Sequence, residues 1–481
     1  MVTRLVRASR IDFTNLRREL ELPTQFPLAA QREADLSAAR VAGELTARTA
    51  SRSSTDRTDI PFVTIDPATS RDLDQALSLH RQASGYRVYY AITDVAAFVL
   101  PGGDLDAETW RRGQTIYLPD GKVPLHPVSL SEGVASLLPG QVCPAVLWTL
   151  DVSTDGSLRD VRVERAVVRS RAKLDYGSVQ AAIDAGGAIE EPIALLPELG
   201  RRLVARGLER GAMNLPIPEQ ELEPDDGGWR LVLRAPLPAE EWNAQISLLT
   251  GMAAGRMMLD GRVGLLRTMP RPRPDAVAKL RAAAPSLGVA WADGASVGEV
   301  LASLDAASPG GAAFVDHAAE LLRGAGYTPL DGGVPDEPEH GAVAAVYAHV
   351  TAPLRRLADR FATEVCLHLA AEQEVPGWVR EALPRLPEAM QSSDRRASTA
   401  ERGAVDLAEA VLLERRVGEE FEATVLDVNE AARPGGVIAV DDPPVRARCE
   451  GVLPLGQRVR VKLAVADPRR RQVLFEVVRS L

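Results

Sequence analysis

A short acidic segment between two apolar runs constrains the fold of this chain more than any other feature. Residues 62–65 are apolar and partly β-branched, which predicts the end of a buried strand, and Pro67 then begins a turn. Asp66, Asp72 and Asp74 lie in and beside that turn, before an alternating pattern resumes. Because side chains two apart on an extended chain share a face, we expect Asp72 and Asp74 to point the same way.

Three carboxylates held this close repel one another unless a cation or a proton joins them. Their hard oxygen atoms suit Mg²⁺ or Mn²⁺, which keep water and phosphate oxygens in their remaining coordination positions. One interpretation is therefore a metal site for phosphodiester hydrolysis. The other is a solvated acidic turn without chemistry. The spacing by itself leaves both open.

The acidic segment resembles the signature of the RNase II family, the RNB exoribonucleases, in which Thr-Ile-Asp and a short turn precede Asp-x-Asp-Asp-Ala. Asp66, Asp72, Asp74 and Ala76 fall on this pattern in register. Gln75 departs from it, because the family most often has a fourth Asp at that position.

A second segment, residues 347–356, is similar to the family's His-Phe-Thr-Ser-Pro-Ile-Arg-Arg motif. Two specific motifs in the family order, far apart in the chain, make a chance match improbable. The resemblance runs from about Leu16 to the C-terminus. Shorter matches lie at residues 86–94, 115–119, 173–176, 210–213 and 240–241.

The resemblance implies a 3′→5′ exoribonuclease that hydrolyses single-stranded RNA to nucleoside 5′-monophosphates with Mg²⁺ or Mn²⁺. It implies that Asp66, Asp72, Asp74 and Gln75 hold the metal, and that Asp74, Asp72 and Arg355 are catalytic. The neutral amide of Gln75 would ligate more weakly than a carboxylate. Two alternatives stay open: a catalytically silent RNA-binding paralogue of the same fold, and a metal phosphohydrolase that acts on small nucleotides.

Four further positions are implied to contact RNA. Tyr117 matches a tyrosine that stacks on a base near the 3′ end, and Leu215 stands in place of a second stacking aromatic. Tyr176 and Glu240 match residues that contact the ribose, where a protein distinguishes RNA from DNA. The structural alternatives are an ordinary core tyrosine for Tyr117 and a surface acid at a helix start for Glu240.

Two adjacent arginines follow Pro353, which suits a first helical position. Arg355 and Arg356 are thus predicted in the first turn of a helix, where the helix dipole disfavours cations and attracts phosphate. The resemblance implies that Arg355 contacts the scissile phosphate, and Arg356 is a candidate RNA contact. The alternative is that both reach solvent or pair with Asp359.

The predicted fold class is a multi-domain α+β protein. Residues 1–58 are expected to form a short helical module, with a helix-turn-helix arrangement as one option, in place of the cold-shock domains of other members. Residues 59–416 are expected to form an RNB-type α/β catalytic domain with a buried channel. Residues 417–481 contain five short alternating runs, which predict an OB-fold β-barrel of the RNA-binding S-one type.

Composition limits the cellular setting. The cysteines at 143, 366 and 449 have no metal-type spacing and fit a reducing cytoplasm. No apolar signal segment or membrane span is visible. The net charge of −10 argues against a bulk polyanion binder, but an enzyme that threads one strand needs only a local basic lining. We expect a cytoplasmic monomer that binds single-stranded RNA and no membrane.

Overall fold

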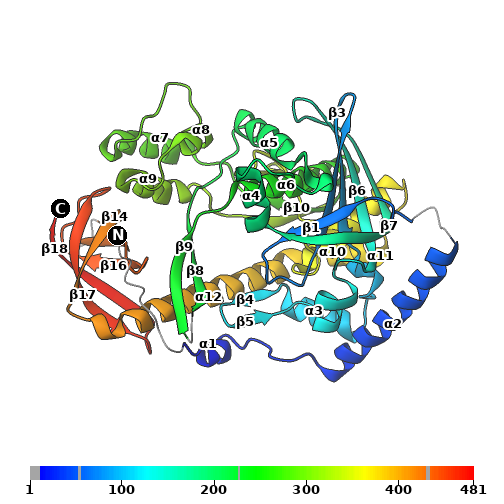
Figure 1. The fold of residues 1–481 in the computed structure, drawn as a ribbon, viewed down its shortest axis with the longest axis horizontal. Helices are drawn as coiled ribbons and strands as arrows, with labels where there is room; N and C mark the ends of the chain where they lie inside the picture. Colours follow the sequence, from blue (N-terminus) through cyan, green and yellow to red (C-terminus); the bar gives the residue numbers. More distant parts are fainter. Residues whose placement is uncertain (1–10, 52–55, 226–227, 430–433, 481) are drawn as a thin grey trace.

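The computed structural model describes residues 11–51, 56–225, 228–429 and 434–480 (Figure 1). Two β-barrels lie at opposite ends of the molecule, with helices between and around them (Figure 1). Within the described ranges, no helix combines the length and apolar character that crossing a bilayer requires.

The first part of the expected catalytic domain contains a closed five-stranded barrel in the order β1-β2-β3-β6-β7. Its members are β1 (Phe62–Asp66), β2 (Gln75–Gln82), β3 (Gly85–Thr93), β6 (Val142–Ser153) and β7 (Leu158–Asp175). The strands pair antiparallel except β1 and β7, which pair in parallel and close the barrel. This closure fixes the acidic segment at the end of β1 and the start of β2.

Alternate residues of these strands enter different apolar clusters, as the period of two requires. Phe62 and Ala76 belong to a cluster with other barrel residues, whereas their neighbours Val63 and Leu77 belong to a larger one. The larger cluster extends onto helices and includes the fully buried Trp148. Among the helices that join it are α4 (Tyr176–Asp184), α5 (Leu196–Arg210), α6 (Pro238–Gly261), α10 (Leu357–Ala370) and α11 (Gly377–Ala382).

The five strands expected in the C-terminal region are confirmed and close into a second barrel, β14-β15-β16-β18-β17. They are β14 (Glu420–Asn429), β15 (Gly435–Val440), β16 (Arg446–Glu450), β17 (Arg458–Asp467) and β18 (Gln472–Ser480). Phe421 and Phe475 meet edge to face in its core, with ring centroids 5.5 Å apart. The long helix α12 (Leu386–Leu413) leads into this barrel (Figure 1).

The two described helices of the N-terminal region pack in different places, and a helix-turn-helix arrangement of residues 1–58 stays a prediction. Helix α1 (Thr14–Glu19) contributes Leu16 to a cluster shared with α12 and the C-terminal barrel. Helix α2 (Leu28–Ser51) instead packs Ala30 and Ala34 near Phe98 and beside α3 (Asp104–Arg112). The two helices use cores provided by other parts of the chain, so they form no compact unit of their own. The domain boundaries near 59 and 416 stay predictions.

Several short strand pairs were not predicted. One hairpin pairs β8 (Glu219–Asp225) with β9 (Gly228–Arg234). Its strands are rich in charged residues, which hides the alternating pattern. The other pairs are β4 (Ile116–Leu118) with β5 (Gly121–Val123), β10 (Val263–Thr268) with β11 (Gly326–Asp331), and β12 (Glu339–His340) with β13 (Ala345–Val346). Helices α7 (Pro274–Ala283), α8 (Val297–Ser303) and α9 (Pro309–Ala319) form a separate cluster beside the C-terminal barrel.

The first barrel depends on a glycine at the β2–β3 turn. Gly85 has φ +140°, and a Cβ atom there would lie 2.1 Å from the Val152 carbonyl oxygen. Gly85→Ala should therefore lower the free energy of unfolding by about 2 kcal/mol, measured by chemical denaturation. The control is Gly43→Ala in α2, where no atom lies within 4 Å and a gain of about 0.5–1 kcal/mol is expected. Equal effects of the two changes would contradict the strain at Gly85.

Candidate active site

The loop between β1 and β2 holds the acidic segment in a fixed shape. Ser136 binds it twice, since its Oγ accepts from the Leu73 N–H at 3.0 Å and donates to the Arg71 carbonyl at 2.6 Å. Leu73 is fully buried and anchors the loop in the barrel cluster. The contacts of Ser136 with the backbone of Arg71 and Leu73 therefore fix the loop that carries Asp72 and Asp74.

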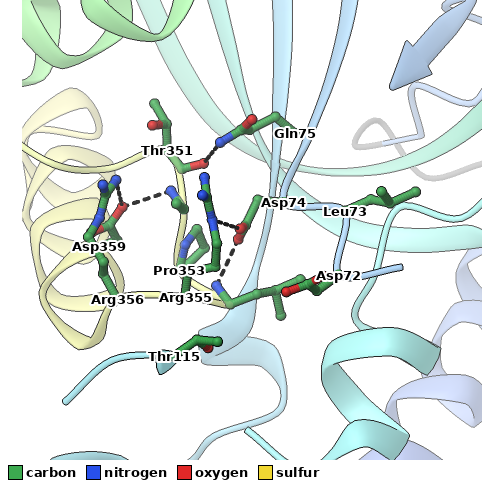
Figure 2. A network of polar contacts seen from close by, with 12 residues as sticks. Asp72, Leu73, Asp74, Gln75, Thr115, Thr351, Pro353, Arg355, Arg356 and Asp359 are labelled. Atoms are coloured by element: carbon green, nitrogen blue, oxygen red, sulfur yellow. Dashed lines mark hydrogen bonds and ion pairs between the residues drawn. The ribbon is translucent and has the colours of Figure 1, made fainter. Parts of the chain in front are cut away.

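Asp74 is buried and faces a segment 280 residues away in sequence (Figure 2). Its Oδ1 accepts a hydrogen bond from the Leu354 N–H at 2.7 Å, and its Oδ2 accepts one from Arg355 Nε at 3.0 Å. Burial raises the pKa of Asp74 to about 7, although Arg355 and the Leu354 N–H oppose the shift. The carboxylate is thus held in a site that tolerates its charge poorly.

Asp66 ends β1 close to Asp74. Burial raises the pKa of its carboxyl to about 7, and the charges of Asp74 and Asp72 add to the shift against Arg355 and Lys173. Among the described residues, none donates a hydrogen bond to the Asp66 carboxylate. Its negative charge is therefore poorly compensated, which favours a cation at this point.

Asp72 has partners of its own. Its Oδ2 accepts a hydrogen bond from the Tyr117 hydroxyl at 3.2 Å, and its Oδ1 lies 2.7 Å from Lys122 Nζ. Lys122 also contacts Glu132 at 2.9 Å. Asp72 and Asp74, two residues apart, are thus bound to different parts of the structure, although their charges still act on each other.

We call residues 351–357 the arginine turn. The prediction that Arg355 and Arg356 lie in the first turn of a helix is wrong, because α10 begins at Leu357 and Arg356 is extended (φ −131°, ψ 128°). The reason is a bridge to a distant segment: the Thr115 N–H donates to the Arg355 carbonyl at 2.9 Å, and the Leu357 N–H donates to the Gly113 carbonyl. This pairing replaces the helical hydrogen bonds that the local sequence favours.

The two arginines point to different carboxylates (Figure 2). Arg355 contacts Asp74 and keeps 42% of its side-chain surface exposed. Arg356 forms two hydrogen bonds of 2.9 Å with Asp359, whose side chain has no exposed surface. For Arg356 the structure therefore shows the alternative that the sequence left open, a pair with Asp359. A direct RNA contact from Arg356 stays a prediction.

Two of the other candidate RNA contacts, Tyr117 and Tyr176, lie near the same carboxylates. Tyr117, on β4, is 50% exposed, so it is not a core tyrosine. The Tyr176 hydroxyl accepts from Asn243 Nδ2 at 3.0 Å, and burial together with Asp66 raises its pKa to about 12. Glu240 lies in the first turn of α6, and Arg234 Nη1 donates to both its carboxylate oxygens at 2.7 and 2.9 Å.

Leu215 lies elsewhere in the fold. It packs against the cluster formed by α7, α8 and α9. Its predicted place beside a stacked base is untested. Gln75 lies at the start of β2, and its Nε2 donates to the Thr351 carbonyl at 2.5 Å (Figure 2). A metal contact from Gln75 also stays a prediction.

Sequence reasoning missed residues that complete the site. Lys122 and Asn243, which bind Asp72 and Tyr176, carry no local pattern that could have revealed them. Tyr90 is different, because it lies in a segment that resembles the family. It is buried with its hydroxyl 2.6 Å from Ser247 Oγ, and it is close enough to Asp66 for that charge to affect its pKa.

The donor set fits a hard divalent cation. In the described part of the chain, no three His, Cys, Asp or Glu side chains lie close enough to enclose a metal ion by themselves. Mg²⁺ does not need such a cage, since it commonly binds one or two carboxylates and completes its shell with water and phosphate oxygens. The under-compensated Asp66, with Asp72 and Asp74 nearby, offers oxygen atoms of the right kind.

Comparison with known proteins gives two family matches. Residues 54–370 match the RNB domain, and residues 419–478 match the RNase II-type exonuclease C-terminal S1 domain. Ribonuclease R of Aquifex aeolicus is 25% identical over 96% of this chain and 70% of its own length. Ribonuclease R 1 of Lactococcus lactis is 25% identical over 77% of this chain, which spans only 47% of that protein.

Solved structures share the fold. The apo form of Mycoplasma genitalium RNase R aligns with a TM-score of 0.82 and 18% identity, over 96% of this chain and 77% of that one. Yeast Ssd1, described as a pseudonuclease, aligns with a TM-score of 0.67 and 17% identity, over 82% of this chain and 50% of that one. The RNB match alone covers more than half of the sequence. The chain therefore belongs to the RNB-domain family of the RNase II and RNase R type, with the C-terminal S1 domain of that family.

Proposed function

We propose that this protein is a metal-dependent 3′→5′ exoribonuclease that hydrolyses single-stranded RNA to nucleoside 5′-monophosphates. One observation carries the proposal: the partly buried carboxylate of Asp66 and the buried carboxylate of Asp74 lie beside the half-exposed side chain of Arg355. Oxygen ligands for a cation thus adjoin a group that binds an anion, the combination that a phosphodiester requires. Attack from the 3′ end and release of mononucleotides are inferred from family membership.

In this proposal Asp66, Asp72 and Asp74 hold Mg²⁺ or Mn²⁺. A bound metal would activate water and neutralise charge that develops on the phosphate. Arg355 donates to Asp74 through its Nε alone, and no hydrogen bond joins its two Nη groups to any other described residue. The Nη groups are therefore available for a phosphate oxygen. Because Asp74 orients the guanidinium before RNA binds, little reorganisation is needed during the reaction.

The surrounding side chains would hold the RNA. The raised pKa of Tyr176 keeps its hydroxyl protonated at neutral pH, so it can donate to a ribose oxygen while it accepts from Asn243. The half-exposed ring of Tyr117 offers a face on which a base can stack, a contact that contributes about 1–3 kcal/mol per base. We also propose that the C-terminal barrel binds the RNA upstream of the site.

Two alternatives make different predictions. A catalytically silent RNA-binding protein is suggested by Gln75 in place of the family's fourth Asp, and by the fold that the chain shares with a pseudonuclease. Metal-dependent release of mononucleotides would exclude it. A phosphohydrolase of small nucleotides would have no need of an S1-type barrel, and it would not shorten an oligonucleotide.

The direct test uses a 5′-labelled single-stranded oligoribonucleotide with Mg²⁺, followed by sizing of products on a gel. Wild type should produce a ladder that shortens from the 3′ end, and chelation of the metal should stop it. Asp74→Asn is isosteric and removes one ligating charge, so the rate should fall roughly a hundredfold or more while RNA binding persists. The exposed Asp160→Asn serves as control and should behave as wild type. An Asp74→Asn variant that retains most of the activity would contradict the assignment.

The adjacent arginines provide a matched pair. Arg355→Ala should lower the cleavage rate roughly a hundredfold with little loss of RNA affinity, and Arg355→Lys should recover only part, since lysine lacks the planar fork. Arg356→Ala leaves the buried Asp359 carboxylate without its partner and should lower the free energy of unfolding by about 3–5 kcal/mol. Cleavage kinetics and chemical denaturation of both variants give the comparison. A catalytic defect in Arg356→Ala without loss of stability would show that the roles are wrongly assigned.

The raised pKa of Asp66 predicts a pH effect on stability. Its ordinary pKa of 3.8 rises to about 7 in the folded protein, so the folded state binds the proton more tightly. Stability from this group is present at low pH and is lost as pH rises from about 4 to about 7. Metal-free Asp66→Asn, which stays neutral, should therefore gain in melting temperature relative to wild type as pH rises through that window.

Added Mg²⁺ should reverse this order at pH 8, because the metal stabilises the ionised wild-type carboxylates and the variant has lost a ligand. Melting curves at several pH values, with and without Mg²⁺, provide the measurement. If the difference between wild type and Asp66→Asn is independent of both pH and Mg²⁺, Asp66 is not a metal ligand.

A further inference from the structure

The arginine turn is held from outside at its backbone carbonyl groups. Gln75 Nε2 donates to the Thr351 carbonyl at 2.5 Å, and His126 Nε2 lies 3.1 Å from the Pro353 carbonyl. Gln75 begins β2, and His126 follows β5 in the chain. They hold two of the four carbonyl groups of the turn that precede Arg355, those of Thr351 and Pro353.

The N–H groups of the turn are also bound. The Ala352 N–H donates to Asp359 Oδ2 at 2.7 Å, and the Leu354 N–H donates to Asp74 Oδ1 at 2.7 Å. The position of the turn thus sets how the Leu354 N–H and the Arg355 guanidinium meet Asp74. A small displacement of the turn would change the geometry at the candidate catalytic carboxylate.

The Thr351 carbonyl determines which end of the Gln75 amide faces it. A backbone carbonyl can only accept, so the amide nitrogen of Gln75, and not its oxygen, faces Thr351. Figure 2 shows the Gln75 amide beside Thr351, whereas the neighbouring Asp74 carboxylate turns toward Arg355. Adjacent residues at the start of β2 therefore serve opposite purposes, one as a donor and one as an acceptor.

The aspartate that the family most often has at this position could not do the same, because an ionised carboxylate has no hydrogen to donate. Thr351 is only 5% exposed, so its carbonyl would lose a partner that water cannot readily replace. The glutamine of this chain thus brings a chemical capability to the turn that the usual family residue lacks.

We propose that Gln75 is a positioning residue that anchors the arginine turn through the Thr351 carbonyl, and that it is not a metal ligand. The anchor holds the Leu354 N–H and Arg355 against Asp74 before RNA or metal binds. Its effect on catalysis rests on the proposed function above, whereas its effect on the turn does not.

Two substitutions separate the two roles of residue 75. Gln75→Met keeps the length of the side chain but removes the donor. Gln75→Glu keeps the shape, removes the donor and adds a charged oxygen that could bind a metal. Gln82→Met, at the exposed far end of the same strand, is the control. Three measurements apply to the full chain: amide hydrogen exchange of residues 350–357 without metal, the Mg²⁺ concentration at half-maximal rate, and kcat with KM on an oligoribonucleotide.

A positioning role predicts that both Gln75 variants accelerate exchange in residues 350–357 roughly tenfold, as expected for the loss of one hydrogen bond. The value of kcat should fall by about the same factor, with KM and the half-maximal Mg²⁺ concentration unchanged within about twofold. Gln82→Met should match wild type in every measurement. A protein that merely lost stability would instead show faster exchange throughout.

A ligand role predicts a different pattern. Gln75→Glu would lower the Mg²⁺ requirement, Gln75→Met would raise it, and exchange in residues 350–357 would stay at the wild-type rate. That result would overturn the proposal. If wild type fails to cleave RNA, the proposed function fails, and the metal-free exchange measurement still decides whether Gln75 anchors the turn.

Discussion

The candidate site depends on one contact, between Asp74 and the arginine turn. A carboxylate removed from water is costly unless donors surround it, and here the donors are the Leu354 N–H and Arg355 Nε. These donors belong to residues that are 280 and 281 positions away from Asp74 in sequence. Burial of Asp74 therefore requires three elements to be in place: the barrel strand β2, the loop before it, and the segment that leads into α10.

In the arginine turn, the neighbouring residues Arg355 and Arg356 have different partners and different proposed roles. Arg356 and Asp359 form a pair with a fully buried carboxylate, and Asp359 also binds the Ala352 N–H, so this pair secures the turn itself. Arg355 contacts Asp74, but 42% of its side-chain surface stays exposed, so an anion can still bind it. Arg355 lies in a turn and Arg356 is extended, and the two side chains reach different carboxylates.

The same site carries more negative charge than the protein compensates. Lys122 neutralises Asp72 at the outer side of the loop, whereas Asp66 has no comparable partner among the described residues. Burial is the main cause of the raised pKa values of Asp66 and Asp74, and the charges of neighbouring carboxylates add to both shifts, so the charge imbalance contributes to them. A divalent cation would relieve it, which links the electrostatics of the acidic loop to the proposed chemistry.

The sequence by itself determined the features that depend on local patterns. The five C-terminal strands could be predicted from their period-two alternation, and the acidic loop from Pro67 and the spacing of its aspartates. Only the tertiary structure decided the rest. The start of α10 was mispredicted because Thr115 pairs with Arg355, a contact between distant segments that overrides local helix preference. The partners of Asp72 and Gln75 were likewise hidden, since a side chain finds its hydrogen-bond partner through the fold and not through its neighbours in sequence.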